Sequence, residues 1–410
     1  MTSPSTRRAG ALAALAALAL IAPPAAAAPG NGIRLGGTDG RLHPYLELES
    51  RWDSNAQFQS DKAEAGLVLH VRPGFSVSAP GDRLALEADA RLDWAQYLTG
   101  TDTAKLSKLF ADASLGLGLN RKGALGLELR DAFQRSTTTA SLTFGSAVIS
   151  NRNNLDLSVP WRPGGGALGV TALGSWKLES FEPYSDCLDL VNASCGKQEL
   201  ADLGYNDLRG GLEAKWRFLP RTAAVLDGSY SVRIPNSEAS SDRVVGWRAN
   251  AGVQGLVTAH LAATLKAGWG SASGTGSVGT WLASAELEWL PSITTSARVG
   301  YVHDWGTDPG KPFALYGNHR VYALGNVLLA GRLSAGLRTQ LEMLDFRTAS
   351  GGSNRIFRLE PTLDYALARW GTVGVGYAMS SRNTDITGQP EGYAYDFTKH
   401  ELWLKARVTY

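Results

Sequence analysis

Apolar and polar residues alternate along many segments of this chain, and this period of two constrains its fold more than any other feature. Near the C-terminus, Leu402, Leu404, Ala406 and Val408 alternate with mostly polar residues, and the chain ends on Tyr410. Successive side chains of a strand point to opposite faces of a sheet, so such a segment predicts a strand with one apolar and one polar face. The same alternation recurs at 83–94, 207–218 and 332–343.

Two environments suit such strands, and the spacing of the turns distinguishes them. In a soluble sandwich the apolar face meets a protein core, whereas in a membrane barrel it meets lipid. Short connections are expected near 80–82, 120–123, 163–166, 219–221, 258–260, 290–292, 330–332 and 369–371. Longer polar loops are expected near 58–63, 99–105, 183–202, 236–241, 306–315, 348–353 and 383–395. Short periplasmic turns that alternate with longer outer loops are typical of outer-membrane barrels.

The segments between these turns give the expected strand count. Strands are predicted near 43–57, 64–79, 83–99, 106–120, 124–137, 145–160, 167–182, 203–218, 223–235, 242–257, 260–273, 278–290, 293–306, 314–330, 332–347, 353–368, 372–383 and 396–410. The fold class is therefore an all-β, antiparallel, up-and-down transmembrane barrel of about 18 strands, with both termini in the periplasm. About 16 strands is the alternative, because the patterns at 106–120 and 145–160 are the weakest.

The N-terminus predicts export from the cytoplasm. Arg7 and Arg8 precede an Ala/Leu-rich run at 9–21 and then small residues, which is the layout of a secretory signal peptide covering 1–27. A short periplasmic segment at 28–42 and a barrel at 43–410 complete the expected domains. No other long apolar run follows, which argues against a helical membrane protein. The formal net charge of +2 argues against nucleic acid as a partner.

Aromatic residues are expected in two belts at the lipid–water interfaces. Residues near the short turns predict the periplasmic belt: Trp161, Trp216, Phe218, Trp289 and Trp370. Residues toward the other strand ends predict the outer belt: Tyr97, Trp305 and Tyr377.

Cys187 and Cys195 lie in the longest expected outer loop. Because the compartment is oxidising, we predict a disulfide between them. A metal site is the rival interpretation, but the loop contains no histidine.

The sequence contains no pattern that predicts catalysis. Of the six histidines, His303 stands beside Asp304, but neighbouring residues of a strand point to opposite faces. No phosphate-binding loop, nucleophile elbow or zinc-protease helix motif is present in the sequence. We therefore expect no enzyme activity, no cofactor and no metal.

Function is expected in the lumen, where the polar faces of the strands meet. The candidate pore-lining residues are Glu87, Asp89, Arg91, Asp93, Arg209, Glu213, Lys215, Arg217, Arg338, Glu342, Trp403, Lys405 and Arg407. Both signs of charge are interleaved, so the same residues could form a cross-strand lattice that only stiffens the wall. If the lumen is open, this composition predicts a hydrated pore without strong charge preference.

The first strand of the mature chain ends in Trp52-Asp53-Ser54-Asn55. This segment resembles the opening strand of the β-barrel porin type 2 family, and the C-terminal strand with Tyr410 is similar to the closing strand that the barrel-assembly machinery recognises. The resemblance implies an outer-membrane barrel tied to the export of capsular or extracellular polysaccharide. It also implies a separate periplasmic export protein as partner, besides outer-membrane lipid and lipopolysaccharide.

Three functions follow from these expectations. Polysaccharide secretion is the leading one, and a general or small-solute porin is the alternative within transport. Porins usually fold a long loop inward, and 183–202 is the candidate for such a loop. A structural or surface-binding barrel is the alternative outside transport.

Overall fold

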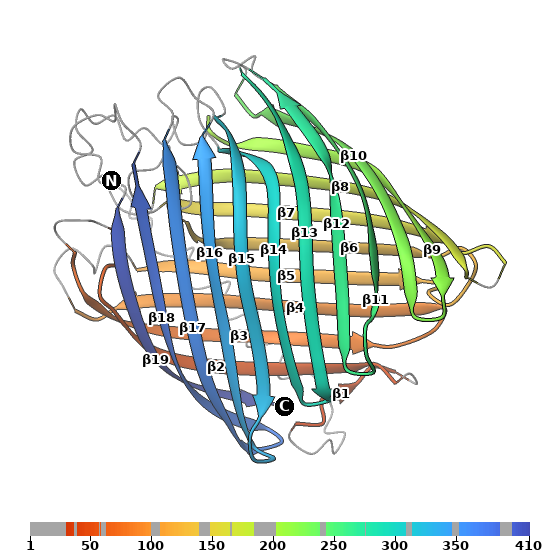
Figure 1. The fold of residues 1–410 in the computed structure, drawn as a ribbon. Coiled ribbons are helices and arrows are strands. Elements are labelled where there is room, and N and C mark those ends of the chain that lie inside the picture. Colours follow the sequence, from red (N-terminus) through yellow and green to blue (C-terminus); the bar gives the residue numbers. More distant parts are fainter. Residues whose placement is uncertain are drawn as a thin grey trace, which may run out of the picture.

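The structure is a computed structural model that describes residues 30–36, 39–56, 58, 63–99, 107–138, 148–164, 166–183, 202–237, 243–274, 276–308, 314–346, 352–385 and 396–410. These residues form a single curved sheet that closes on itself (Figure 1). Among them, no helix has the length and apolar character needed to span a bilayer. The signal peptide and both cysteines lie outside the described residues.

The barrel strands agree closely with the expected segments. The strands are β1 (Ile33–Arg34), β2 (Arg41–Asp53), β3 (Gly66–Ala79), β4 (Leu84–Tyr97), β5 (Lys108–Leu119), β6 (Leu127–Thr138), β7 (Val148–Trp161), β8 (Leu168–Pro183), β9 (Tyr205–Leu219), β10 (Thr222–Pro235), β11 (Val244–Leu256), β12 (Leu261–Ser273), β13 (Ser277–Ser292), β14 (Thr295–Asp308), β15 (Ala314–Leu328), β16 (Leu333–Phe346), β17 (Ser353–Ala368), β18 (Gly371–Thr384) and β19 (Phe397–Thr409). The two weakest segments, β5 and β7, are both strands, so the alternative of about 16 strands is not realised.

Each strand from β2 to β19 pairs antiparallel with the next one along the chain. β19 pairs with β2, from Glu401↔Asp53 to Thr409↔Tyr45, and this ladder closes an 18-stranded barrel. The short β1 pairs with the start of β2 and takes no part in the closure. The prediction of a closed up-and-down barrel is therefore confirmed.

The short turns all lie at the end of the barrel that carries the C-terminus (Figure 1). Three of them contain residues in the left-handed region: Asn120 with φ 50°, Gly164 and Gly166 with φ 59° and 85°, and Gly331 with φ 62°. Asparagine and glycine tolerate this region better than other residues, which explains why they mark these turns. Beside three other short turns the ladders shift register, between Thr222/Ala223, Trp289/Ser292 and Ala366/Ala368.

The two faces of the wall differ as the sequence predicts. Bulky apolar side chains such as Leu212 (60% exposed) and Leu404 (64% exposed) point outward. The aromatic residues near the short turns lie on the exterior face as expected, with Trp216 59% exposed and Trp370 45% exposed. Such an apolar exterior with an aromatic rim is the surface that a bilayer requires.

Of the three aromatics expected in the outer belt, Tyr377 does face outward, since it pairs with the exposed Leu402, but the other two do not. Tyr97 and Trp305 are each 7% exposed and lie inside the barrel. Tyr97 shares the odd-numbered face of β4 with the inward Asp93, so alternation sends it inward. Other exposed aromatics toward these strand ends include Trp52, Trp94, Trp176, Tyr230, Trp247, Trp269 and Trp281. Tyr230 pairs with Trp247, and Trp269 with Trp281, on neighbouring strands.

The end of the barrel opposite the short turns is called the outer end here. At this end the sheet overlaps itself beside β14. The β13–β14 ladder stops at Ala283↔His303, although β13 continues its pairing with β12 as far as Ser277. β14 meanwhile stays paired with β15 as far as Asp308. Figure 1 shows the upper end of β14 bending away from β13. The ladder breaks at the level of the exposed Trp281. Exposed tryptophans are enriched at lipid–water interfaces, where water can satisfy unpaired backbone groups.

A second overlap lies beside β6. The β5–β6 ladder stops at Ala111↔Arg135, whereas β6 stays paired with β7 up to Thr138↔Val148. Ile149 belongs to the outward face of β7, yet it is 2% exposed and packs on Val68 and Tyr97. Those two side chains belong to the inner face of β3 and β4. The outer end of β6–β7 therefore lies on the lumen side of β3 and β4.

The two strand ends that lie inside the barrel, that of β14–β15 and that of β6–β8, meet in one apolar cluster. It contains Trp305 and Leu315 from the end of β14–β15 and Val148 and Phe181 from the ends of β7 and β8. The remaining members come from the inner faces of β9 and β11–β13: Tyr205, Val244, Ala272, Val278 and Leu282. Outer-end apolar residues that would face lipid in a regular barrel are thus buried in the lumen, and the outer mouth is narrowed.

Candidate pore wall and outer constriction

All the pore-lining residues predicted from the sequence lie on the inward face of the wall. On β4, Ala85 and Ala95 share the buried face, whereas Leu92 and Trp94 are exposed outward. The same parity holds on β9, β16 and β19. The inward set is Glu87, Asp89, Arg91, Asp93, Arg209, Glu213, Lys215, Arg217, Arg338, Glu342, Trp403, Lys405 and Arg407. Whether these residues contact a solute stays a prediction.

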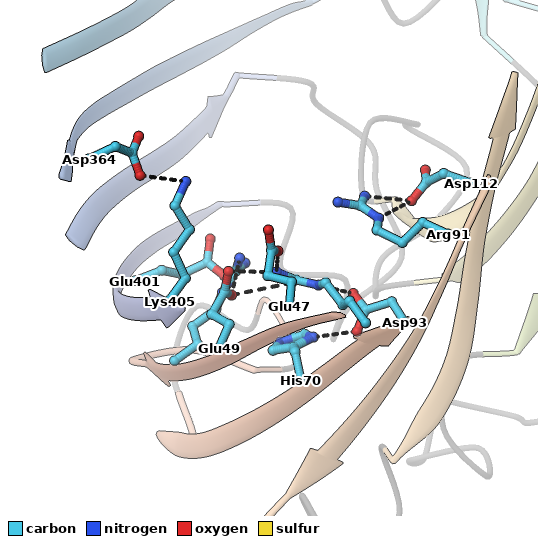
Figure 2. A network of polar contacts seen from close by, with 11 residues as sticks. Glu47, Glu49, His70, Arg91, Asp93, Asp112, Asp364, Glu401 and Lys405 are labelled. Carbon is cyan, nitrogen blue, oxygen red and sulfur yellow. Dashed lines mark hydrogen bonds and ion pairs between the residues drawn. The ribbon is translucent and has the colours of Figure 1, made fainter. Parts of the chain in front are cut away.

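A dense ion-pair network covers the inner face of β2–β4 (Figure 2). At its centre, the guanidinium of Arg72 donates to Glu47 at 2.9 Å, to Glu49 at 2.6 Å and to Asp93 at 2.9 Å. His70 Nδ1 lies 2.8 Å from the other oxygen of Asp93. These side chains are buried by one another, so the network forms a rigid, fully paired section of wall.

Looser ion pairs continue the lattice around the barrel. Figure 2 shows Arg91 with Asp112, at 2.6 Å, and Lys405 with Asp364, at 3.0 Å. Both pairs are partly exposed to the lumen, and exposed pairs contribute little to stability. Their role is to leave charged groups along the water-filled part of the wall.

A second network lies on the inner face of β7–β9. Glu179 on β8 accepts from Arg152 at 2.7 Å and from the hydroxyl of Tyr205 at 2.5 Å, and it pairs with Lys177 at 2.7 Å. Further toward the short turns, Lys266 pairs with Asp227 at 2.9 Å and Glu213 with Lys215 at 2.8 Å. The two networks together support the lattice interpretation for the paired members of the candidate set.

Other inward charges have no ion pair among the described residues. These include Arg217, Arg338, Arg358 and Glu87, all of them exposed to the lumen. A charged group that is neither buried nor paired must be hydrated, so these residues mark the aqueous part of the interior. They are the side chains best placed to meet a passing solute.

Trp403 does lie inward, but it is not free to act as a binding surface. It is 7% exposed and packs where Gly376 leaves room, since a Cβ there would lie 2.3 Å from the indole ring. The guanidinium of Arg51 lies 5.1 Å from the indole centroid. Trp403 therefore fills the wall rather than lining an open path.

The Trp52-Asp53-Ser54-Asn55 segment locks the seam at which the barrel closes. Asp53 is 2% exposed and pairs with Lys399 of β19 at 2.7 Å. Ser54 donates its backbone N–H to the carbonyl of His400, and its hydroxyl accepts from the N–H of His400. Asn55 Nδ2 lies 3.4 Å from the carbonyl of Thr398. Each polar residue of the motif thus contacts the last strand.

Asp53→Asn is expected to destabilise the closed barrel by about 1–3 kcal/mol, because the buried Lys399 would lose its closer carboxylate and keep only Glu401, at 3.6 Å. The midpoint of urea unfolding in phospholipid vesicles measures this loss. Lys122→Met is the control, because Lys122 pairs with Asp82 while 77% of its side chain is exposed. Equal unfolding midpoints for the two variants would contradict a seam lock.

The sequence predicts only in part which residues hold the end of β14–β15 inside the barrel. Arg248 of β11 donates to both carboxylate oxygens of Asp304, at 2.8 and 3.0 Å, and to the carbonyl of Trp305 at 3.0 Å. Arg233 of β10 donates to the carbonyl of Thr307 at 3.1 Å. Alternation predicts that both arginines face inward, but nothing local in the sequence indicates their partners three or four strands away.

Two further expectations concern chemistry and the inward loop. His303 stacks on Trp281 and His319, while Asp304 turns to Arg248, so the adjacent pair does point apart. Among the described residues, no group of three or more potential metal ligands occurs. Of the expected inward loop at 183–202, only residues 183 and 202 are described, so the prediction of an inward loop stays untested. In the described part of the chain, the ends of β6–β8 and β14–β15 lie in the lumen.

A closed antiparallel barrel with an apolar exterior and a charged interior defines a β-barrel of the porin class. The chain belongs to the family described as "Putative beta-barrel porin 2", whose model matches residues 29–409. It is therefore an outer-membrane porin barrel. This agrees with the family that the opening strand resembles.

Solved structures of similar fold include several outer-membrane proteins. The outer-membrane protein OpdK of Pseudomonas aeruginosa is 14% identical, with 90% of this chain and 99% of that chain covered and a TM-score of 0.45. The channel DcaP of Acinetobacter baumannii is 11% identical, with coverage of 92% and 99% and a TM-score of 0.42. The ferric enterobactin receptor PfeA of Pseudomonas aeruginosa is 10% identical, with coverage of 90% and 80% and a TM-score of 0.46. No curated protein sequence matches the chain.

Proposed function

We propose that this barrel is a selective diffusion channel for small hydrophilic solutes, with both termini on the periplasmic side. The observation that carries this proposal is the contrast between the two halves of the lumen. Exposed, unpaired charges such as Glu87 and Arg217 line the half near the short turns, whereas the inward ends of β6–β8 and β14–β15 narrow the outer half. Such a lumen favours small solutes over polymers.

The charge balance of the wall argues for weak charge selection. Exposed groups of both signs face the lumen, for example Glu87 and Arg338, and most buried charges are paired. A pore of this kind passes hydrated solutes of either charge, with the narrow outer part as the main barrier.

Reconstitution into planar bilayers tests the proposal. The folded protein is expected to give discrete conductance steps, and vesicles that contain it should swell in monosaccharides but not in long oligosaccharides. A folded barrel that conducts no ions would contradict the channel and would favour the structural or surface-binding barrel.

Secretion of a capsular or extracellular polysaccharide is the second candidate. The observation in its favour is the family-like segment at 52–55, which locks the closing seam. A polymer would require the inward ends to part, and a separate periplasmic export protein would have to deliver it. Loss of surface polysaccharide after deletion of the gene would support this function; unchanged polysaccharide with reduced solute uptake would support the diffusion channel.

A further inference from the structure

The outer end of β14–β15 is fixed against the inner faces of β11 and β12 by a socket for one side chain. The ring of Trp305 lies where Gly246 and Gly270 have no side chain: a Cβ on Gly246 would lie 2.3 Å from the ring, and a Cβ on Gly270 3.0 Å from Nε1. The guanidinium of Arg248 covers the ring at 3.7 Å from its centroid. These residues come from β11 and β12, across the broken ladder from β14.

Polar contacts complete the attachment. Arg248 bridges the carboxylate of Asp304 and the carbonyl of Trp305, and Arg233 reaches the carbonyl of Thr307. Arg233 is itself held by Asp207 at 2.8 Å and lies over the ring of Tyr205 at 4.1 Å. Arg233 is thus held by the wall independently of its contact with β14.

The attachment differs from the rest of the interior in two ways. First, β14 has no ladder partner on its β13 side beyond His303, so side-chain contacts replace backbone pairing over 304–308. Second, the Asp304 side chain is 37% exposed, so the contact with Arg248 borders the aqueous lumen. An end that is held by a few side chains at the edge of the water can be released by single substitutions.

We propose that the outer end of β14–β15, residues 304–308 and 315–317, is the constriction that sets the size limit of the channel, and that Arg248 with the glycine socket for Trp305 fixes its position. The proposal rests on the diffusion-channel function and assigns its specificity to these residues. The Asp304 carboxylate and the Arg248 guanidinium are the charged groups that a solute passes there.

The decisive variant shortens this end. A tight two-residue turn between His303 and His319, in place of 304–318, removes it, and these positions are suited to such a turn because His303 pairs with His319. We expect single-channel conductance to rise about twofold or more, because conductance follows the open cross-section. Vesicles should also admit larger neutral oligosaccharides than wild type does.

Two substitutions test the attachment without shortening the chain. Gly246→Leu should expel Trp305 from its socket, and Asp304→Arg should repel Arg248; each is expected to raise the conductance toward that of the shortened variant. Arg248→Asp combined with Asp304→Arg restores an opposite-charge pair and should return the conductance toward wild type. Lys122→Met, in a turn at the other end of the barrel, should leave it unchanged.

The outcomes separate this proposal from the channel function itself. Folding is checked for each variant by β-type circular dichroism and by the shifted migration of unheated barrel on gels. Wild-type conductance and size limit in a folded shortened variant would overturn the constriction. A silent wild type with a conducting shortened variant would uphold the constriction and overturn open diffusion. Silence in both would overturn the channel.

Discussion

Arg72→Met should destabilise the barrel by about 3–5 kcal/mol, the largest effect expected of any single substitution in the wall. Arg72 is 7% exposed and is the common partner of Glu47, Glu49 and Asp93. Removal of the guanidinium would leave these carboxylates close together with little water to solvate them. Methionine keeps much of the side-chain volume, so the loss would report charge rather than a cavity.

The free energy of unfolding in phospholipid vesicles, from urea titration, measures this effect. Arg91→Met is the matched control, because Arg91 faces the same lumen from the next strand but is partly exposed and pairs with Asp112. It should cost no more than about 1 kcal/mol. Similar losses for the two variants would mean that water reaches the Arg72 network and that the network is not a buried unit.

Leu212→Arg should destabilise the barrel by about 2–4 kcal/mol, because the charge would enter the lipid near the middle of the bilayer. Leu212 is 60% exposed on the outer face, near the middle of β9. Unfolding in vesicles measures this loss as well.

Thr171→Arg is the control for this second variant. Thr171 lies on the neighbouring strand opposite Glu213, and Leu212 pairs with Ala172, so the two positions share one level of the wall but opposite faces. An arginine at 171 would point into the lumen beside a carboxylate and should be tolerated. A larger loss at 171 than at 212 would mean that the apolar face does not meet lipid.

The sequence predicted the strands and their faces well because that information is local. Alternation fixes which side chains of a strand share a face, and turn residues such as Asn120 and Gly331 mark where a strand ends. For the same reason Asp93 and Arg91 could be assigned to the interior without knowledge of their partners. The error at Tyr97 was avoidable, because its position on the odd face of β4 already places it inward.

The role of the segment at 52–55 required the closed barrel. Asp53 and Lys399 stand at opposite ends of the chain, and they meet only because β19 returns to β2. The family resemblance identified the segment; the structure supplies the reason for it, since a barrel that closes on its first strand needs specific contacts at that seam.

By itself, the sequence determined a barrel of alternating strands, its two faces and its two kinds of connection. Only the tertiary structure decided where that wall stops being regular. Trp305 obeys the same alternation as Val299 on β14, yet one lies in the lumen and the other faces outward. The difference depends on Gly246, Gly270 and Arg248, which belong to other strands, and on the loss of the β13 ladder above Trp281. A period of two specifies the face of a residue within its strand, but the path of that strand depends on the space and the partners that distant strands provide.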